Sequence, residues 1–120
     1  MKTVLIADDS LFMRTVIKGI LAGRYEVIEA DSGETCLKRF EDDKPDLVLL
    51  DVVMPEGDEA GVRVLRRIME EQPQAKVVMI SALGKEDAVI KECLTLGAKD
   101  CIAKPFDESR VRSVVEELLH

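Results

Sequence analysis

The sequence predicts an α/β fold in which helices cover both faces of a parallel sheet. Two observations over its 120 residues indicate this class. Short runs of branched aliphatic residues recur roughly every 20 to 25 residues, and the stretches between them carry apolar residues at helical spacing. Hydrophobic residues make up 47% of the chain and charged residues 34%, which is the balance of a folded globular domain.

Five apolar runs are the predicted strands. The first, third and fourth are almost continuously apolar, which is typical of central strands in a sheet that is covered on both faces. The second alternates between apolar and polar residues, so we expect it at an edge of the sheet. The runs span residues 4–7, 25–30, 47–50, 77–80 and 101–103.

Five helices are expected between and after these strands. The first follows Ser10, a residue type that caps helix starts, and ends before Gly23. Its apolar face consists of Phe12, Val16, Ile17, Ile20 and Leu21. The other helices are expected near residues 34–41, 60–71, 85–96 and 108–119, and the residues that mark their boundaries are Ser32, Gly57, Pro73, Gly84, Gly97 and Asp107.

Strands that alternate with helices imply right-handed crossovers and a doubly wound sheet. Five such units suit a flavodoxin-like (βα)5 sandwich with the parallel strand order 2-1-3-4-5. Ligands of this architecture bind beyond the carboxyl ends of the strands. Since no linker or low-complexity segment interrupts the chain, residues 1–120 are expected to form one domain.

Charge and cysteine content argue against several classes of function. A formal net charge of -7 disfavours nucleic acid and anionic membranes as partners. The three cysteines, Cys36, Cys93 and Cys101, are odd in number and widely spaced, which predicts reduced core thiols rather than disulfides or a zinc site. The first apolar run is too short for a signal peptide or a membrane span, so we expect a cytoplasmic protein. No coiled-coil seam is evident, and we expect a monomer.

Polar residues follow four of the predicted strands. Asp8 and Asp9 follow the first, Asp51 the third, Ser81 the fourth and Lys104 the fifth, so all are expected at one edge of the sheet. Two carboxylates about 4 Å apart repel by roughly 4 kcal/mol at an effective dielectric constant of about 20. A divalent cation would relieve this repulsion, and a partly open set of oxygen ligands suits Mg²⁺ better than Ca²⁺.

The same cluster gives Asp51 a reason to act as a nucleophile. A carboxylate can form an acyl phosphate when a metal and a cation neutralise the charge on the incoming phosphoryl oxygens. Lys104 supplies the cation and Ser81 a hydroxyl donor. Each residue alone has an ordinary explanation as a helix cap, a loop charge or a solvent-facing lysine. Their coincidence on successive strand ends favours a functional site.

Several segments resemble the receiver domains of two-component systems, and the resemblance covers essentially the whole chain. The matching segments are Ala7-Asp8-Asp9-Ser10, Leu49-Leu50-Asp51-Val52-Val53-Met54-Pro55, Ser81-Ala82, and Gly97-Ala98-Lys99-Asp100 leading to Lys104-Pro105-Phe106. Receiver domains are known examples of the strand order 2-1-3-4-5, so that order is not a prediction independent of the resemblance.

The resemblance implies a role for each residue of the cluster. Asp51 would accept a phosphoryl group from a CheA-like histidine kinase. Mg²⁺ would be held by Asp8, Asp9, Asp51 and the backbone carbonyl of Val53. Ser81 and Lys104 would bind phosphoryl oxygens. The protein would then be a switch and not an enzyme, apart from self-catalysed phosphoryl transfer and slow autodephosphorylation.

Some features near Lys104 follow the family and others depart from it. The bond between Lys104 and Pro105 is commonly cis in the family, and Phe106 would pack beneath that turn. An aromatic residue usually stands three positions before the lysine, where this chain has Cys101. The segment 56–61 carries about two residues more than the family's usual Met-Asp-Gly, so the loop after Asp51 is expected to differ locally.

The resemblance also concerns how the signal is reset and passed on. The positions that tune self-hydrolysis would be Val53 and Leu83, which cannot orient a water molecule, so we expect slow hydrolysis and a separate phosphatase. Because nothing follows His120, output is expected through binding a motor or adaptor protein, and the likeness to stand-alone CheY-type receivers favours chemotaxis.

Three alternative functions stay open. One is a phosphorelay receiver in a developmental circuit, and another is a constitutive interaction module with a vestigial acidic pocket. A phosphohydrolase with an aspartyl phosphate would normally carry a second acid two residues after the nucleophile, where this chain has Val53.

Overall fold

The computed structural model describes residues 1–82 and 87–120, and strands and helices alternate along them. The strands are β1 (Thr3–Ala7), β2 (Glu26–Ala30), β3 (Leu47–Asp51), β4 (Val77–Ala82) and β5 (Asp100–Lys104). The helices are α1 (Leu11–Leu21), α2 (Gly33–Asp43), α3 (Ala60–Glu71), α4 (Asp87–Leu96) and α5 (Glu108–Leu119).

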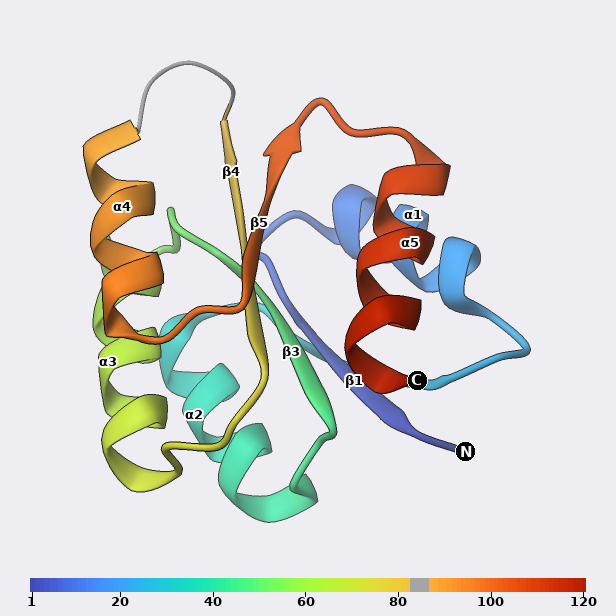
Figure 1. Ribbon diagram of the computed structural model, residues 1–120, viewed down its shortest axis with the longest axis horizontal. Helices are drawn as coiled ribbons and strands as arrows, with labels where there is room; N and C mark the ends of the chain where they lie inside the picture. Colours follow the sequence, from blue (N-terminus) through green and yellow to red (C-terminus); the bar gives the residue numbers. More distant parts are fainter. Residues whose placement is uncertain (83–86) are drawn as a thin grey trace.

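The strands form one parallel sheet in the order β2-β1-β3-β4-β5, which confirms the predicted fold. Helices α1 and α5 cover one face of the sheet, and α2, α3 and α4 cover the other (Figure 1). The alternating strand β2 lies at an edge, as predicted. The chain order reverses between β1 and β3, so the crevice beyond their carboxyl ends is the place where this architecture binds ligands.

Each face of the sheet has its own hydrophobic core. Leu5 and Leu50 point toward the core under α2, α3 and α4, whereas their neighbours Ile6 and Leu49 point toward the core under α1 and α5. All four side chains are fully buried, and each contributes about 1.5–3 kcal/mol from the transfer of its apolar surface out of water. A strand that buries both of its faces must be apolar at every position, which explains the unbroken apolar runs in β1 and β3.

The predicted helix starts are mostly confirmed. The side chains of Ser10, Ser32 and Asp107 each accept a hydrogen bond from a backbone N–H in the first turn of α1, α2 and α5. The third helix spans Ala60–Glu71, as predicted, and Gly57 lies three residues before its start. The residue that precedes this helix, Glu59, makes no capping bond with its side chain.

The predicted ends of several strands were also wrong by one or two residues. Strand β3 includes Asp51, β4 continues through Ser81 to Ala82, and β5 runs from Asp100 to Lys104. These polar residues continue the parallel ladder, in which Asp51 pairs with Ile80 and Ser81 with Ala103. Backbone pairing decides where a strand ends, and hydropathy does not report it.

The remaining boundaries differ only slightly from the predicted ones. Helix α2 spans Gly33–Asp43 rather than 34–41, since the capping box at Ser32 starts it earlier. Strand β2 begins at Glu26 rather than Tyr25. The predicted starting residues of the fourth helix, together with Gly84 and Leu83, lie outside the described residues.

Two of the three cysteines are buried, as predicted. Cys36 and Cys93 lie in the core, and burial raises the pKa of the Cys36 thiol to about 12, so it stays protonated. Cys101 is only partly buried, which corrects the prediction for that residue.

Within the two described ranges, every helix falls short of the length and hydropathy needed to cross a bilayer.

Candidate functional site

Three polar side chains are buried in the described part of the chain, and all lie near the carboxyl ends of the strands. Asp8 follows β1, Asp51 ends β3 and Ser81 lies near the end of β4, with exposed fractions of 1%, 6% and 4%. Burying a carboxylate costs several kcal/mol unless it is paired. Two such carboxylates at the ligand-binding edge of the sheet are therefore a sign of function.

Lys104, the last residue of β5, joins these carboxylates to one another. Its ammonium nitrogen lies 2.7 Å from Oδ2 of Asp51 and 3.2 Å from Oδ2 of Asp8, and its side chain is 26% exposed. Burial lowers the pKa of Lys104, but the two carboxylates, Asp51 first, outweigh burial and raise it above its usual value. The lysine is therefore charged at neutral pH.

One ammonium group does not balance the acidic cluster. Burial raises the pKa of Asp51, the hydrogen bond and charge of Lys104 lower it, and the nearby Asp8 raises it again, with a net value of about 6. The N–H of Val53 also donates to Oδ1 of Asp51 at 3.3 Å. The site still carries a surplus of negative charge that a further cation would neutralise.

The carboxylates lie close enough together to bind one metal ion. Asp8, Asp9 and Asp51 each offer one oxygen, and the three oxygens lie within 4.8 Å of one another. The N–H of Ser10 donates to Oδ1 of Asp8 at 2.9 Å, which fixes the orientation of that carboxylate. Asp9 is exposed, so solvent molecules can complete the coordination. Few oxygen ligands with room for water fit Mg²⁺.

Ser81 lies against Cys101, which stands where the resemblance predicts an aromatic residue. Its hydroxyl oxygen is 3.6 Å from the sulfur of Cys101 on the neighbouring strand β5. The two positions are therefore in contact here through a thiol and a hydroxyl. The predicted contact of Ser81 with a phosphoryl oxygen stays a prediction.

The turn after Lys104 follows the resemblance closely. The peptide bond between Lys104 and Pro105 is cis. Phe106 is partly buried and packs against the core under α1 and α5, and its predicted packing beneath the turn stays a prediction. The carbonyl of Val53 as a metal ligand stays a prediction, since Mg²⁺ coordination through this backbone oxygen is known only from the resemblance.

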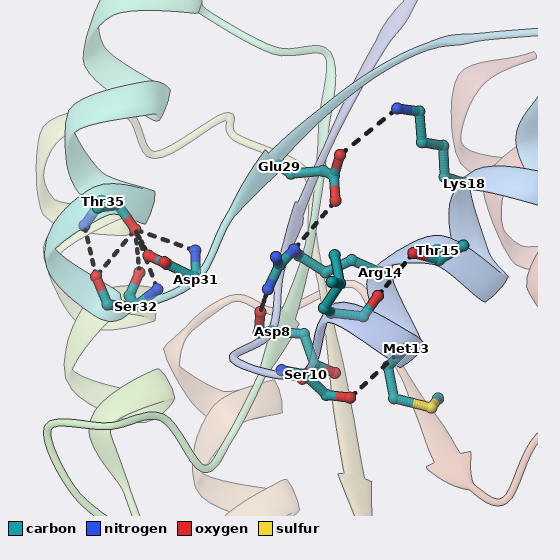
Figure 2. A network of polar contacts seen from close by, with 11 residues as sticks. Asp8, Ser10, Met13, Arg14, Thr15, Lys18, Glu29, Asp31, Ser32 and Thr35 are labelled. Atoms are coloured by element: carbon teal, nitrogen blue, oxygen red, sulfur yellow. Dashed lines mark hydrogen bonds and ion pairs between the residues drawn. The ribbon is translucent and has the colours of Figure 1, made fainter.

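The sequence analysis assigned no role to Arg14. In the structure, its side chain links the residue that follows β1 to strand β2. Its Nη1 donates to the backbone carbonyl of Asp8 at 2.8 Å, and its Nε bonds Oε1 of Glu29 at 3.0 Å. Figure 2 shows Arg14 between these two residues, with Lys18 on the other side of Glu29. A signal was present, because Arg14 stands one helical turn after the cap Ser10.

The chain belongs to the family of response regulator receiver domains, whose model matches residues 4–116. It is accordingly a CheY-like receiver of two-component signal transduction. The chemotaxis protein CheY of Listeria monocytogenes is 44% identical over 119 residues, which cover 98% of each chain. The chemotaxis protein CheY of Bacillus subtilis is 40% identical and covers 98% of this chain and 97% of its own.

Solved receiver structures resemble this fold. The CheY of Borrelia burgdorferi, solved in a CheX-CheY-BeF3-Mg²⁺ complex, superposes with a TM-score of 0.89 at 36% identity and covers 99% of this chain and 90% of its own. The receiver domain of NtrX from Brucella abortus has a TM-score of 0.88 at 32% identity, covering 97% of both chains.

Proposed function

We propose that this receiver is a phosphorylation switch in chemotaxis signalling, with Asp51 as the phosphoacceptor and Mg²⁺ as its cofactor. The observation that carries the proposal is the contact of Lys104 with Asp51 at 2.7 Å, beside the buried carboxylate of Asp8. A nucleophilic carboxylate, a fixed cation and an open acidic cluster are the parts that phosphoryl transfer needs.

The side chains have separate tasks in this proposal. A carboxylate oxygen of Asp51 attacks the phosphorus of a phosphohistidine on a CheA-like kinase, so that a P–O bond forms and the P–N bond breaks. The imidazole leaves with the electron pair and takes up a proton. Lys104 and the hydroxyl of Ser81 stabilise the phosphoryl oxygens, and bound Mg²⁺ would neutralise charge on the carboxylates and the phosphoryl group.

The signal then passes to a partner protein. We propose that residues 1–120 act as one receiver domain whose phosphorylated form binds a motor or adaptor protein. The CheX-CheY complex supports this, because it gives a CheY relative in a complex with another protein. A separate phosphatase would reset the switch.

The intact mass of the protein tests the phosphoacceptor directly. After incubation with acetyl phosphate and Mg²⁺, we expect a gain of one phosphoryl mass, about 80 Da, that EDTA and the substitution Asp51→Asn abolish. A matched control is Asp58→Asn, an exposed aspartate in the following loop, which should be phosphorylated like the wild-type protein. No gain in mass under conditions that modify a known receiver would place the vestigial interaction module first.

The rate of dephosphorylation gives a second test. The side chain of Val53 is apolar and 42% exposed, so it cannot orient an attacking water molecule beside Asp51. We expect phosphorylated wild-type protein to lose its phosphoryl group several times more slowly than the Val53→Asn variant, whose amide can hold a water. The loss is measured from intact mass over time after removal of acetyl phosphate. Equal half-lives would contradict this explanation.

A further inference from the structure

The first turn of α2 is capped from two sources. Its own loop supplies Ser32, whose hydroxyl oxygen accepts from the N–H of Thr35 at 3.1 Å, and Figure 2 shows this pair at the start of the helix. The preceding two N–H groups, of Gly33 and Glu34, donate to Oε1 and Oε2 of Glu56 at 2.9 and 3.0 Å. A carboxylate from the loop between β3 and α3 therefore completes the cap of a different helix.

The contact between Glu56 and α2 depends on two local features. The backbone N–H groups of Glu34 and Gly33 lower the pKa of Glu56, so the carboxylate is ionised at neutral pH. A Cβ atom at Gly33 would lie 3.3 Å from Oε1 of Glu56 and 3.0 Å from Cγ2 of Val64. Because glycine has no Cβ atom, the space beside its N–H is open to the carboxylate of Glu56.

Glu56 belongs to the short segment that also contains Val53. Met54 and Gly57 exchange backbone hydrogen bonds of 3.2 and 2.9 Å, which makes a tight turn with Glu56 inside it. Before the turn, the N–H of Val52 donates to the carbonyl of Ile80 at 3.1 Å. The backbone of Val53 is therefore attached on both sides. The residue before it bonds strand β4, and the turn after it is fastened to helix α2 by Glu56.

We infer that Glu56 is a positioning residue for the metal site, which holds the backbone of Val53 beside Asp51 by fastening the turn to α2. It acts through the loop and touches neither the metal nor the phosphoryl group. The inference rests on the proposed function and on the prediction that the backbone carbonyl of Val53 joins the carboxylates around Mg²⁺. Glu56 is also the first residue of the segment 56–61, in which the resemblance predicts about two residues more than the family usually carries.

The test is an NMR titration of ¹⁵N-labelled protein with MgCl₂ alone, without any phosphoryl donor. In the wild-type protein, the amide signals of Gly33 and Glu34 should shift with the same Kd as that of Val53. The amide of Thr35, which bonds Ser32 instead of Glu56, is the internal control and should shift less. In the Glu56→Gln variant we expect binding about tenfold weaker, with the Gly33 and Glu34 shifts lost.

Two further variants separate positioning from charge and from stability. Glu59→Gln removes the same charge from the same loop, and its side chain makes no capping bond, so its Kd should match that of the wild-type protein. Gly33→Ala keeps the charge of Glu56 but crowds its carboxylate, so it should weaken Mg²⁺ binding while the melting temperature stays within about 4 °C of wild type.

The outcomes distinguish the inference from the proposed function. If the wild-type protein binds Mg²⁺ and the Glu56→Gln variant binds it with the same Kd, the positioning role is overturned and the switch stands. If the amide signals of Gly33 and Glu34 do not shift at saturating Mg²⁺, the positioning role is overturned as well. A wild-type protein whose amides show no response to Mg²⁺ overturns both.

Discussion

Replacing Asp51 with asparagine is expected to stabilise the metal-free protein by about 2–3 kcal/mol at pH 7.5. The pKa of Asp51 is about 6 in the folded protein, against 3.8 as its ordinary value, chiefly because the carboxyl is buried. A difference of about 2 pKa units corresponds to roughly 3 kcal/mol by which ionisation of this group opposes folding. Asparagine has nearly the same shape and no charge, so it removes that cost.

The sign of the pH dependence follows from the direction of the shift. Between about pH 4 and pH 6 the folded protein binds more protons at Asp51 than the unfolded chain does. The stability that this proton contributes is fully present below pH 3.8 and is lost as the pH rises through about 6. Wild-type protein should therefore lose stability relative to Asp51→Asn as the pH is raised from 5 to 7.5.

Urea denaturation in EDTA measures this difference, with Asp58→Asn as the matched control. Both variants lose one negative charge, but Asp58 is exposed, so its replacement should change the free energy of unfolding by less than about 0.5 kcal/mol. Equal stability of wild type and Asp51→Asn at pH 7.5 would show that burial of this carboxylate costs nothing. The site would then have no surplus charge for Mg²⁺ to neutralise.

Replacing Lys104 with methionine is expected to have the opposite effect and to destabilise the metal-free protein by about 3 kcal/mol at pH 7.5. The ammonium group neutralises Asp51 at 2.7 Å and Asp8 at 3.2 Å, and methionine keeps much of its volume without its charge. Removing one partner of a buried ion pair leaves an uncompensated charge, which typically costs 3–5 kcal/mol. The lower end applies because the lysine is partly exposed.

The dependence on pH and on metal identifies the cause of this loss. Protonation of the cluster at pH 5 should return part of the lost stability, and so should saturating Mg²⁺, because each supplies positive charge at the same place. Lys99→Met is the matched control, since Lys99 is exposed and its loss changes the net charge equally. If both variants have the same midpoint in urea at pH 7.5 in EDTA, the lysine does not neutralise the cluster.

Both variants measure how much free energy the burial of the acidic groups costs the fold. Asp51→Asn removes one of the buried charges, and Lys104→Met removes the cation that compensates them. The fold keeps two acidic groups out of water at the crevice between β1 and β3, and a single lysine compensates them in part. A metal ion, and the groups that would surround a bound phosphoryl group, would neutralise these carboxylates and remove the cost of burying them. The free energy that burial takes from the stability of the metal-free fold would then be available for binding.

The sequence pattern by itself was sufficient for the alternation of strands and helices and for the members of the acidic cluster, whereas the strand order was predicted together with the family resemblance. Continuous apolar runs arise because the strands in the middle of the sheet bury both faces, and a local pattern of hydropathy reports this. Asp8, Asp9, Asp51 and Lys104 directly follow or end such runs, so their position at one edge follows from the parallel arrangement. Helix starts at Ser10, Ser32 and Asp107 are equally local, because a cap bonds a residue three positions away.

Contacts between distant parts of the chain required the tertiary structure. Lys104 meets Asp8 across 96 positions, and Glu56 caps α2 from 22 or 23 positions away. The boundaries of β3, β4 and β5 depend on pairing with a neighbouring strand, and Arg14 has its role only because β1 and β2 lie side by side. Hydropathy along the chain describes burial, whereas these contacts depend on directions and distances that only the packed fold defines.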